Sequence, residues 1–565
     1  MEVSDLVRTL LAKRGIESDE HVDAFLNPDY VAHTHDPMLL SDMPNAVTRF
    51  FAALEKGERI AVYGDYDCDG IGGAVVLSDF LRRIGHTDFE VYLPHRDLEG
   101  YGFHVSAAEA LAQRGAKLII TVDVGISGVA AARRALELGV DVIITDHHEP
   151  MGEVPHAIAV VNPKLSPTNS GQATYPFRDL CGAAVAFKFV QAALAEGRAR
   201  GLPAFRTIPV GWEKWLLDAV AIATVSDMVP LTGENRTLLH FGLQVLRKSP
   251  RPGLRALCEV ARVDQRNLAE DDIGFLIAPR LNAASRMDEP QLAFELLTTQ
   301  DIAAAFTVAR KLETLNKERK GIVGGIVKQA KKRSRERFGD ADLVAVLGDV
   351  AWRPSLLGLA ANSLCQERGG VVCLWGRDAA GNLKGSCRSD GLISLVDLFG
   401  NAEGVFEQYG GHARSGGFTV SHERVHTLPE DLARAAQASA RGAHPQEITH
   451  DATLPLSAIC YDLFSDLSRL SPFGIGNPKP VFLIPEARVG AVRRFGKEKN
   501  HVEVMLECER TDSSVRAFDF FKGPEHFSQP PTVGVASHVL ATLERDAFRG
   551  PRALALRIVD ILAAA

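Results

Sequence analysis

The eight cysteines of the sequence include no CxxC pair and follow no regular spacing. Structural zinc sites and the disulfide frameworks of small secreted domains both require such spacing. The sequence therefore indicates neither zinc nor disulfides. Reduced thiols of this kind are typical of a cytoplasmic protein.

Long apolar runs are also missing from the sequence. No uninterrupted apolar segment has the length of a membrane span, and the N-terminal MEVSDLVRTLLAKRG lacks the apolar core of a secretion signal. We therefore expect a cytoplasmic protein that does not enter a membrane.

Aromatic residues are few, at 7% of 565 residues, whereas 46% of the chain is hydrophobic and 24% is charged. This profile is typical of ordinary globular proteins and excludes disordered and fibrous ones. Because a single hydrophobic core stops growing well below this length, we expect several packed domains.

The chain has no overall excess of positive charge, since its formal net charge is −8. Phosphate backbones are bound by clustered lysines and arginines, so this value argues weakly against a nucleic-acid partner. The acidic residues, however, concentrate around the motifs described below, and the segment KQAKKRSRER (328–337) is strongly basic. The net charge thus leaves nucleic-acid binding open.

From about residue 58, short apolar runs alternate with helix-like segments. The runs are ERIAVYGD, FEVYLP, KLIITVDV, VDVIITDH and AIAVVNP, and we expect helices over 70–84, 105–115 and 127–139. This alternation predicts a parallel α/β sheet. Acidic and histidine-containing motifs follow the runs, at the strand ends where such sheets bind ligands.

Three further regions follow this sheet. Residues 301–338 predict an exposed helix of about 55 Å if it is continuous, although Gly321, Gly324 and Gly325 allow a kink or break. A second α/β unit begins at LVAVLGD (343–349), includes VVCLWG (371–376) and ends before about residue 440. Runs such as ARVGAVRRF, HVEVMLEC, SVRAFDFF and ASHVLATLERD then predict a small β-barrel.

Three carboxylates lie within five residues at Asp65, Asp67 and Asp69, directly after the first apolar run. Carboxylates this close repel one another unless cations neutralise them. An Asp-rich turn that caps the next helix is the alternative interpretation. An EF-hand is excluded, because Val76 stands where the loop needs a bidentate glutamate.

Further acids and histidines end later apolar segments; they are Asp123, Asp146, His147, His148 and Asp227. Taken singly, Asp123 could be a helix cap, Asp227 is most often a cap or turn residue, and two adjacent histidines in a loop are often polar surface. Together with the first motif, they could hold two divalent ions about 3.5–4 Å apart, which would clamp the attacking and leaving oxygens of a phosphodiester displacement.

The motifs GDYDCDG, TVDVGIS, TDHH and VSDMVPL, in this order and spacing, resemble those of the DHH phosphoesterases. The resemblance implies two divalent cations, Mn²⁺ or Mg²⁺, with the ligands Asp67, Asp69, Asp123, His147 and Asp227. It further implies three supporting roles: Asp65 as a ligand or close support, Asp146 as the group that orients an imidazole, and His148 as a phosphate contact or general acid.

Cys68 departs from the family pattern, in which alanine is usual at this position. We expect its thiol to point away from the cations, because successive side chains alternate in an extended segment.

Later segments resemble the RecJ family within the DHH phosphoesterases. The segment APRLNAASR (278–286) implies contacts to the scissile region from Arg280, Asn282 and Arg286, although ion pairs with nearby acids are an equal alternative for the arginines. The segments GSCRS (385–389) and GGHARSGG (410–417) resemble the DHH-associated domain. They imply substrate contacts from Ser386, Arg388, Gly410, Gly411 and His412.

The final segment interleaves basic and aromatic residues in RRFGK (493–497) and RAFDFFK (516–522). Such a surface can stack bases and hold phosphates, as oligonucleotide-binding barrels do, although alternating phenylalanines more often belong to a core. The segment SPFGIGNPKPVF (471–482) also resembles the RecJ barrel domain.

We therefore expect a multidomain α/β protein with five parts. They are an N-terminal helical segment (1–45), a parallel-sheet DHH core (46–250), a helical region with a long connector helix (251–340), a DHH-associated α/β domain (341–445) and an OB-like nucleic-acid-binding β-barrel (446–565).

The resemblance implies a metal-dependent exonuclease that degrades single-stranded DNA from 5′ to 3′ to nucleoside 5′-monophosphates in DNA repair and recombination. It suggests single-stranded-DNA-binding protein and a recombination helicase as partners of a monomer. One alternative is a DHH-type phosphodiesterase for oligonucleotides or cyclic dinucleotides, which lacks the barrel and the long connector. The other is a catalytically inactive DNA-binding scaffold, in which the metal-binding acids are eroded.

Overall fold

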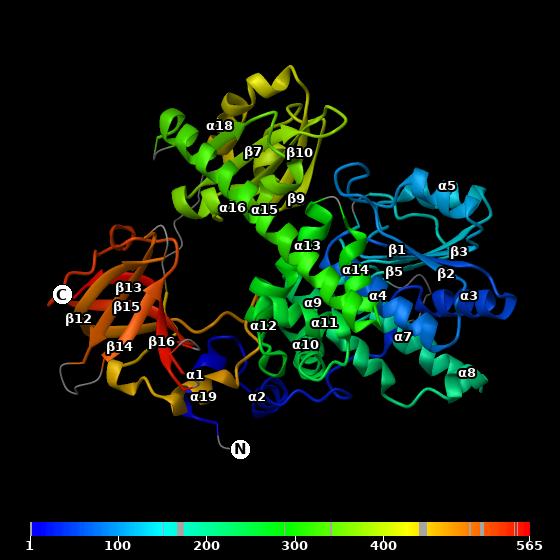
Figure 1. Ribbon diagram of the computed structural model, residues 1–565, viewed down its shortest axis with the longest axis horizontal. Coiled ribbons are helices and arrows are strands. Elements are labelled where there is room, and N and C mark those ends of the chain that lie inside the picture. Colours follow the sequence, from blue (N-terminus) through cyan, green and yellow to red (C-terminus); the bar gives the residue numbers. More distant parts are fainter. Residues whose placement is uncertain are drawn as a thin grey trace. The chain divides into compact units, whose positions relative to one another are not determined.

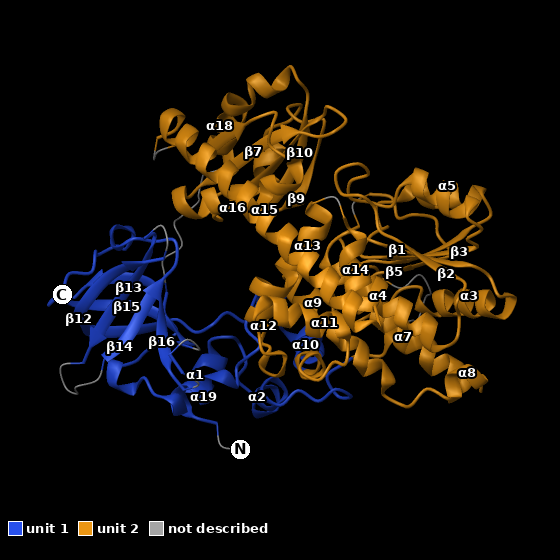
Figure 2. Cartoon of the chain, viewed as in Figure 1, with its two compact units in different colours: residues 1–34, 230–240, 447–565 blue, residues 35–229, 241–446 orange. Residues whose placement is uncertain are grey.

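The computed structural model describes residues 3–150, 152–166, 174–287, 289–339, 342–439, 449–496, 499–508, 514–546, 549–550 and 552–564. Its contacts divide the chain into two compact units (Figures 1 and 2). The first unit combines residues 1–34, 230–240 and 447–565, and the second combines residues 35–229 and 241–446.

The second unit begins with a parallel sheet in the strand order β2-β1-β3-β4-β5. The strands are β1 (Ile60–Gly64), β2 (Phe89–Tyr92), β3 (Leu118–Val122), β4 (Asp141–Thr145) and β5 (Ala159–Val161). The expected helices are present within two residues at each end as α4 (Cys68–Arg83), α5 (Val105–Gln113) and α6 (Val129–Glu137). The prediction of a parallel α/β sheet is confirmed.

Helices cover both faces of this sheet (Figure 1). Helices α5 and α6 share a core with Tyr63, Ile119 and Ile144 of the strands. Helix α4 packs on the other face with α3 (Met43–Lys56) and α7 (Gly182–Ala199). Both faces are therefore buried, which explains why the strands read as continuous apolar runs rather than alternating ones.

A helical region follows the first sheet. Its helices are α8 (Pro203–Arg206), α9 (Leu217–Ser226), α10 (Gly233–Leu246), α11 (Pro252–Ala261), α12 (Glu270–Asp272), α13 (Ala278–Arg286), α14 (Gln291–Thr298) and α15 (Ile302–Arg337). Helix α15 is the expected connector and is continuous through Gly321, Gly324 and Gly325. Packing against α11, α13, α14 and α16 stabilises it despite the low helix propensity of glycine.

The second sheet has the strand order β6-β7-β8-β10-β9, and only β6 and β7 are parallel. Its elements are β6 (Val344–Gly348), α16 (Pro354–Arg368), β7 (Val371–Arg377), β8 (Leu383–Ser389), α17 (Leu395–Asn401), β9 (Gln408–His412), β10 (Ser415–Val420) and α18 (Leu428–Ser439).

The expectation that the chain has no disulfide is wrong at one pair. Cys373 on β7 and Cys387 on β8 face each other in the antiparallel register and form a disulfide. Sequence spacing could not show this pair, because the pairing of two strands, and not a cysteine motif, brings the two side chains together.

The first unit contains a sheet in the order β11-β12-β13-β14-β16-β15, and an additional β12–β15 pairing closes five of these strands into the predicted barrel. The elements are α1 (Asp5–Ala12), α2 (Asp19–Leu26), β11 (Ala452–Thr453), α19 (Tyr461–Ser468), β12 (Phe482–Phe495), β13 (His501–Glu507), β14 (Ser514–Asp519), β15 (Ala536–Arg545) and β16 (Leu554–Ala563).

The N-terminal helices belong to the same core as the barrel. Leu10 and Leu11 of α1 and Phe25 of α2 are buried in one cluster with barrel residues such as Val504 and Ile558. The N-terminal segment is therefore not a separate part. The expected boundary between residues 445 and 446 lies outside the described residues. Within the described ranges, none of the helices combines the length and the apolar composition that a membrane crossing needs.

Candidate metal centre

The acidic motifs meet at the carboxyl edge of the first sheet, where the strand order reverses. Strand β1 lies between β2 and β3, so the connections leave it in opposite directions and open a crevice. Asp65 follows β1, Asp123 follows β3, and the triplet Asp146-His147-His148 follows β4. Topology thus brings together residues that are far apart in the sequence.

The turn after β1 is a helix cap as well as an acidic cluster. Asp67 is the N-cap of α4, and its Oδ1 accepts a hydrogen bond of 2.9 Å from the backbone N–H of Asp69. Gly70 makes the turn possible, because a Cβ there would lie 2.3 Å from the backbone nitrogen of Asp65. The capping interpretation is correct for Asp67, but it uses only one of the carboxylates.

Asp69 links α4 to the N-terminus of α7. Its Oδ2 accepts a hydrogen bond of 2.6 Å from the N–H of Gly182, and its Oδ1 accepts one of 2.7 Å from the N–H of Ala183. A helix N-terminus favours negative charge at this position. Even so, burial and the charge of Asp67 raise the pKa of Asp69 to about 6.

Asp123 has a left-handed backbone conformation, with a φ of 61°. Aspartate and asparagine tolerate this conformation better than most residues. Gly182 lies directly against it, since a Cβ on Gly182 would be 2.5 Å from the Cβ of Asp123. We did not predict a role for Gly182, because no spacing rule connects it to the acidic motifs.

The ring of His147 points into the carboxylate cluster. Its Nε2 lies 3.1 Å from Asp123 Oδ1, 3.6 Å from Asp69 Oδ2 and 3.6 Å from Asp227 Oδ2. Burial lowers the pKa of His147 to about 3, so the imidazole is neutral. A neutral ring nitrogen facing three carboxylates is a suitable metal ligand.

The carboxylates of the cluster repel one another. Burial, together with neighbouring charges, raises the pKa of Asp65, Asp123 and Asp227 well above the usual value. In addition, Asp65 Oδ1, Asp123 Oδ1 and His147 Nε2 are buried and form no hydrogen bond of suitable geometry among the described residues, although His147 Nε2 lies 3.1 Å from Asp123 Oδ1. Buried polar atoms of this kind call for an explanation, and an ion is one of the few available.

The same side chains form three groups, in each of which the ligand atoms lie within 4.8 Å of one another. The groups are Asp65, Asp67 and Asp123; Asp69, His147 and Asp227; and Asp123, His147 and His148. Carboxylate oxygens with some imidazole suit Mn²⁺ and Mg²⁺, and Asp123 belongs to two of the three groups. The donor set and its unpaired buried atoms therefore fit two divalent cations.

Asp146 orients His148 rather than His147. Its Oδ1 lies 2.8 Å from His148 Nδ1, and its Oδ2 accepts a hydrogen bond of 2.8 Å from the N–H of Ile126. Burial lowers the pKa of His148, but the interaction with Asp146 outweighs it, so the net pKa is raised. The hydroxyl of Tyr101 lies 3.1 Å from the same Nδ1.

Cys68 is the first residue of α4, and its thiol lies against the backbone oxygen of Ala278 at 3.6 Å, away from the ligand groups. The expected direction is correct, but the reason is the helical turn and not the alternation of an extended segment. The backbone N–H of Cys68 donates a hydrogen bond of 2.9 Å to Oδ1 of Asn282. Asn282 therefore positions the acidic turn.

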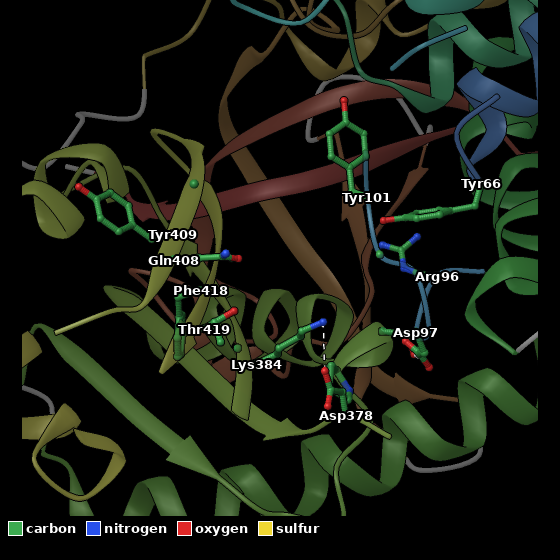
Figure 3. A pocket seen from close by; sticks show the side chains of 16 residues that line it. Tyr66, Arg96, Asp97, Tyr101, Asp378, Lys384, Gln408, Tyr409, Phe418 and Thr419 are labelled. Atoms are coloured by element: carbon green, nitrogen blue, oxygen red, sulfur yellow. Dashed lines mark hydrogen bonds and ion pairs between the residues drawn. The ribbon is translucent and has the colours of Figure 1, made fainter. Parts of the chain in front are cut away.

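A groove of about 560 Å³ lies between the first sheet and the second sheet of this unit (Figure 3). On one side, the guanidinium of Arg96 lies over the ring of Tyr66 at 4.5 Å, near Tyr101. On the other side are Tyr409 and Lys384, whose Nζ lies 3.1 Å from Asp378. We did not predict Arg96 or Tyr101, although the loop after β2 lies at the same sheet edge as the acidic motifs.

Of the two arginines predicted on α13, Arg280 is already neutralised. Its Nε donates a hydrogen bond of 2.8 Å to Glu313, which matches the alternative interpretation. Arg286 has no carboxylate partner among the described residues, and its NH1 donates to the backbone oxygen of Ser355 at 2.6 Å. Burial and the charges of Arg96 and Arg319 lower the pKa of Arg286 to about 9.

The predicted residues of the second sheet fall into two groups. Ser386 and Arg388 share one face of β8, and a Cβ on Gly358 of α16 would lie 2.8 Å from Arg388 NH2. Burial lowers the pKa of Arg388, and no carboxylate among the described residues forms an ion pair with it. On β9, Gly410, Gly411 and His412 are exposed, and Gly410 lines the groove.

The barrel carries the expected aromatic surface, but acids neutralise most of its cations. His501 contacts the exposed rings of Phe520 and Phe521, with centroids 5.2 and 4.9 Å apart. Arg493 and Arg516 instead pair with Glu503, at 2.6 and 2.5 Å. Lys497 lies outside the described residues. The barrel surface therefore provides exposed aromatic rings but little positive charge that is free of acidic partners.

Family models match two parts of the chain. The model of the DHH family, N-terminal domain, matches residues 59–224, and the model of the RecJ OB domain matches residues 450–560. These matches cover the barrel and the first sheet with its acidic motifs through His148, whereas Asp227 lies three residues after the first match.

Curated relatives match over most of the chain. The single-stranded-DNA-specific exonuclease RecJ of Bacillus subtilis is 34% identical over 527 residues, which are 93% of this chain but 64% of that protein, so the chain spans just under two thirds of its length. The protein of the same name from Escherichia coli is 31% identical over 90% of this chain and 87% of its own length.

The crystal structure of RecJ from Thermus thermophilus in complex with Mn²⁺ is similar in fold, with a TM-score of 0.77 and 28% identity over 99% of this chain and 78% of that chain. Its complex with Mg²⁺ gives a TM-score of 0.74. The acidic cluster, the barrel and these likenesses agree with one another: the chain belongs to the RecJ family of DHH phosphoesterases.

Proposed function

We propose that this chain is a metal-dependent exonuclease that hydrolyses single-stranded DNA. The observation that carries the proposal is the cluster at the carboxyl edge of the first sheet, where buried carboxylate and imidazole atoms converge without hydrogen-bond partners. The groove beside it is lined by aromatic rings, among them Tyr66, Tyr101 and Tyr409, and by Arg96, which suits a strand with exposed bases and phosphates.

Asp65, Asp67, Asp69, Asp123, His147 and Asp227 would hold two divalent cations, Mn²⁺ or Mg²⁺. Bound there, the cations would polarise the scissile phosphate and stabilise the charge that develops on it. The chain itself orients the reaction. Asp146 holds His148 at the edge of the cluster, where it can contact the phosphate or protonate the leaving oxygen.

Arg286 and Arg388 are the best candidates for phosphate contacts. Both are partly buried cations without a carboxylate partner among the described residues, so an anion would offset the desolvation that lowers their pKa. Arg280 supports the site indirectly, since its pairing with Glu313 ties α13 to α15. Asn282 acts in the same way, by holding the turn that carries Asp67 and Asp69.

Degradation from 5′ to 3′, with release of nucleoside 5′-monophosphates, is part of this proposal. The test is incubation of strands labelled at either end with Mn²⁺ or Mg²⁺. A 5′ label should appear at once as mononucleotide, whereas a 3′ label should remain on gradually shortening strands. Immediate release of the 3′ label would contradict the direction. A clear preference for cyclic dinucleotides or very short RNA would favour the phosphodiesterase alternative, and no cleavage with either ion would favour the inactive scaffold.

The family resemblance also suggests properties for which the fold itself offers no evidence. A monomer in the cytoplasm, with single-stranded-DNA-binding protein and a recombination helicase as partners in DNA repair and recombination, remains a prediction. Co-purification of the tagged chain from cells with damaged DNA would test the partners.

Replacing Arg388 with alanine is expected to raise KM for 5′-phosphorylated strands about tenfold or more, because charge-assisted hydrogen bonds to phosphate contribute about 1.5–3 kcal/mol. The variant Arg388→Lys keeps the charge but loses the planar fork, so it should recover only part of the loss. Steady-state kinetics on strands with and without the 5′-phosphate provide the measurement. Unchanged KM and unchanged cleavage in Arg388→Ala would refute the assignment.

Replacing Phe520 and Phe521 together with alanine is expected to weaken the binding of long single strands, since base stacking contributes about 1–3 kcal/mol per base. The side chain of Phe521 is 78% exposed and that of Phe520 is 41% exposed, so folding should be little affected. Point variants are preferable to deletion of the barrel, because a deletion would expose the apolar faces of α1 and α2, which pack in the barrel core.

The matched control for this pair is Tyr461→Ala, which removes an exposed aromatic ring of the same unit from a different element, helix α19. Binding of a long fluorescent strand and processivity on it are the readouts, with cleavage of a trinucleotide as the measure of chemistry. If both readouts equal those of the unmodified chain, these phenylalanines do not contact bases.

A further inference from the structure

Helix α15 concentrates positive charge in a chain that is acidic as a whole. Its residues 302–337 include eleven lysines and arginines but only three glutamates, whereas the formal net charge of the chain is −8. The basic segment 328–337 is only the end of this excess. None of these exposed lysines and arginines belongs to the candidate metal centre.

The exposed cations are aligned along one face of the helix. The residues of this face follow each other at intervals of three or four, and all of them are exposed: Arg310, Thr314, Lys317, Gly321, Gly324, Lys328, Lys332 and Arg335. At 3.6 residues per turn they fall within an arc of about 80° and extend over about 37 Å. We call this row the α15 stripe.

The stripe faces away from the helices that hold α15 in place. Residues on the other side of the helix, such as Ala309, Leu312 and Ala330, are fully buried, and α15 packs there against α11, α13, α14 and α16. Figure 1 shows α15 as the long helix that runs between the two sheets of this unit. The stripe is therefore a rigid surface rather than a mobile tail.

Two glycines separate the cations of the stripe into two groups. A Cβ on Gly321 or Gly324 would meet no atom within 4 Å, so neither glycine is needed for packing among the described residues. Glycine is also among the least favourable residues in a helix. Without side chains at these two positions, the helix backbone is exposed, and a bound polymer can approach it closely.

The cations of the stripe are only weakly engaged by acids. Lys317 and Lys332 lie 3.3 and 4.0 Å from glutamates one turn away, with side chains that are 72% and 79% exposed. Arg310 and Lys328 form no ion pair within the described part of the chain. This differs from the barrel, where Glu503 engages Arg516 at 2.5 Å with both side chains largely buried. Exposed pairs of this kind contribute little and are easily exchanged for another anion.

We propose that the α15 stripe binds the sugar-phosphate backbone of single-stranded DNA outside the metal centre. The inference rests on the proposed function, which supplies a long polyanion as the substrate. A row of separate cations along about 37 Å of helix matches an extended polymer with regularly spaced charges.

The test replaces Lys317, Lys328 and Lys332 with glutamine in one variant of the full chain. Its matched control replaces Lys56, Lys117 and Lys248, which are exposed lysines outside α15, and changes the net charge by the same amount. Affinity for a long fluorescent strand is measured without divalent cations between about 50 and 200 mM salt. Hydrolysis of a trinucleotide with Mn²⁺ is measured separately.

In the stripe variant, the slope of log affinity against log salt should become shallower by about 2, because each lost phosphate contact contributes about 0.7 for a single strand. Trinucleotide hydrolysis should stay within about twofold of the unmodified chain, since the stripe lies outside the metal centre. The control variant should keep both the slope and the affinity.

An unchanged slope and affinity in the stripe variant would overturn the proposal. So would lysine-dependent binding of a polyglutamate peptide in place of DNA, which would assign the surface to an acidic protein segment. The experiment distinguishes failure of this inference from failure of the proposed function. If the chain binds DNA through the stripe but hydrolyses no DNA, only the proposed function is refuted. If the chain hydrolyses DNA and the stripe variant binds it unchanged, only this inference is refuted.

Discussion

Replacing Asp123 with asparagine is expected to reduce the rate of DNA hydrolysis at saturating Mn²⁺ by at least about 10³-fold, because transition-state stabilisation by metal ions amounts to several kcal/mol. Asp123 contributes to two of the three candidate ligand groups, so its loss would weaken both of the proposed cation sites. Asparagine is chosen over alanine because the φ of 61° at this position is tolerated by asparagine. His147→Ala should have a similar effect.

A second measurement distinguishes a lost ligand from a damaged fold. Without metal, the Asp123→Asn variant should unfold at a higher temperature than the unmodified chain, since it removes one carboxylate from a cluster whose members raise each other's pKa. Addition of Mn²⁺ should then stabilise the variant less, because ligands stabilise a fold in proportion to their binding.

Asp88→Asn serves as the control for Asp123→Asn, because Asp88 is exposed and precedes β2, at the opposite edge of the sheet. The control should hydrolyse DNA and respond to Mn²⁺ as the unmodified chain does. Hydrolysis by Asp123→Asn within tenfold of the unmodified rate would show that Asp123 is not a ligand.

Replacing Arg251 with leucine is expected to lower the free energy of unfolding by about 3–5 kcal/mol, because breaking a buried ion pair leaves its partner charged and buried. Arg251 Nε lies 2.6 Å from Asp218, and its NH2 lies 2.7 Å from Asp79. Burial opposes the charge of Arg251, but these two carboxylates outweigh it and raise its pKa. Urea unfolding of the second unit provides the measurement.

Arg251 also connects the two helices that carry residues of the candidate metal centre. Asp79 lies on α4 and Asp218 on α9, and the same two helices carry Asp69 and Asp227 at or near their ends. Loss of Arg251 should therefore also reduce the affinity for Mn²⁺. The exposed Arg255→Leu on α11 is the control and should cost less than about 0.5 kcal/mol. A loss below about 1 kcal/mol in Arg251→Leu would mean that the carboxylates find other partners.

The sequence predicted the architecture well where local patterns decide it. Apolar runs followed by helical spacing located the five strands of the first sheet, and the alternating runs after residue 480 predicted the barrel. The acidic motifs could be located because they follow strands, and strand ends of a parallel sheet share an edge. Asp65, Asp123 and His147 required only this rule to be placed together.

The sequence did not indicate which predicted residues are free to act. Arg280 and Arg286 lie on one helix six residues apart, yet only Arg280 has a carboxylate partner among the described residues, because Glu313 reaches it from α15. The basic residues of the barrel looked equally available, and Glu503 neutralises several of them. Ion pairs between distant segments have no signature in the spacing of either segment.

Tertiary structure alone decided three further features: the disulfide between Cys373 and Cys387, the place of α1 and α2 in the barrel core, and the roles of Asn282 and Gly182 beside the acidic turns. Local periodicity and strand-end motifs are determined within a few residues of sequence. Contacts between remote segments depend on strand register and helix packing, and these are set only when the whole chain folds.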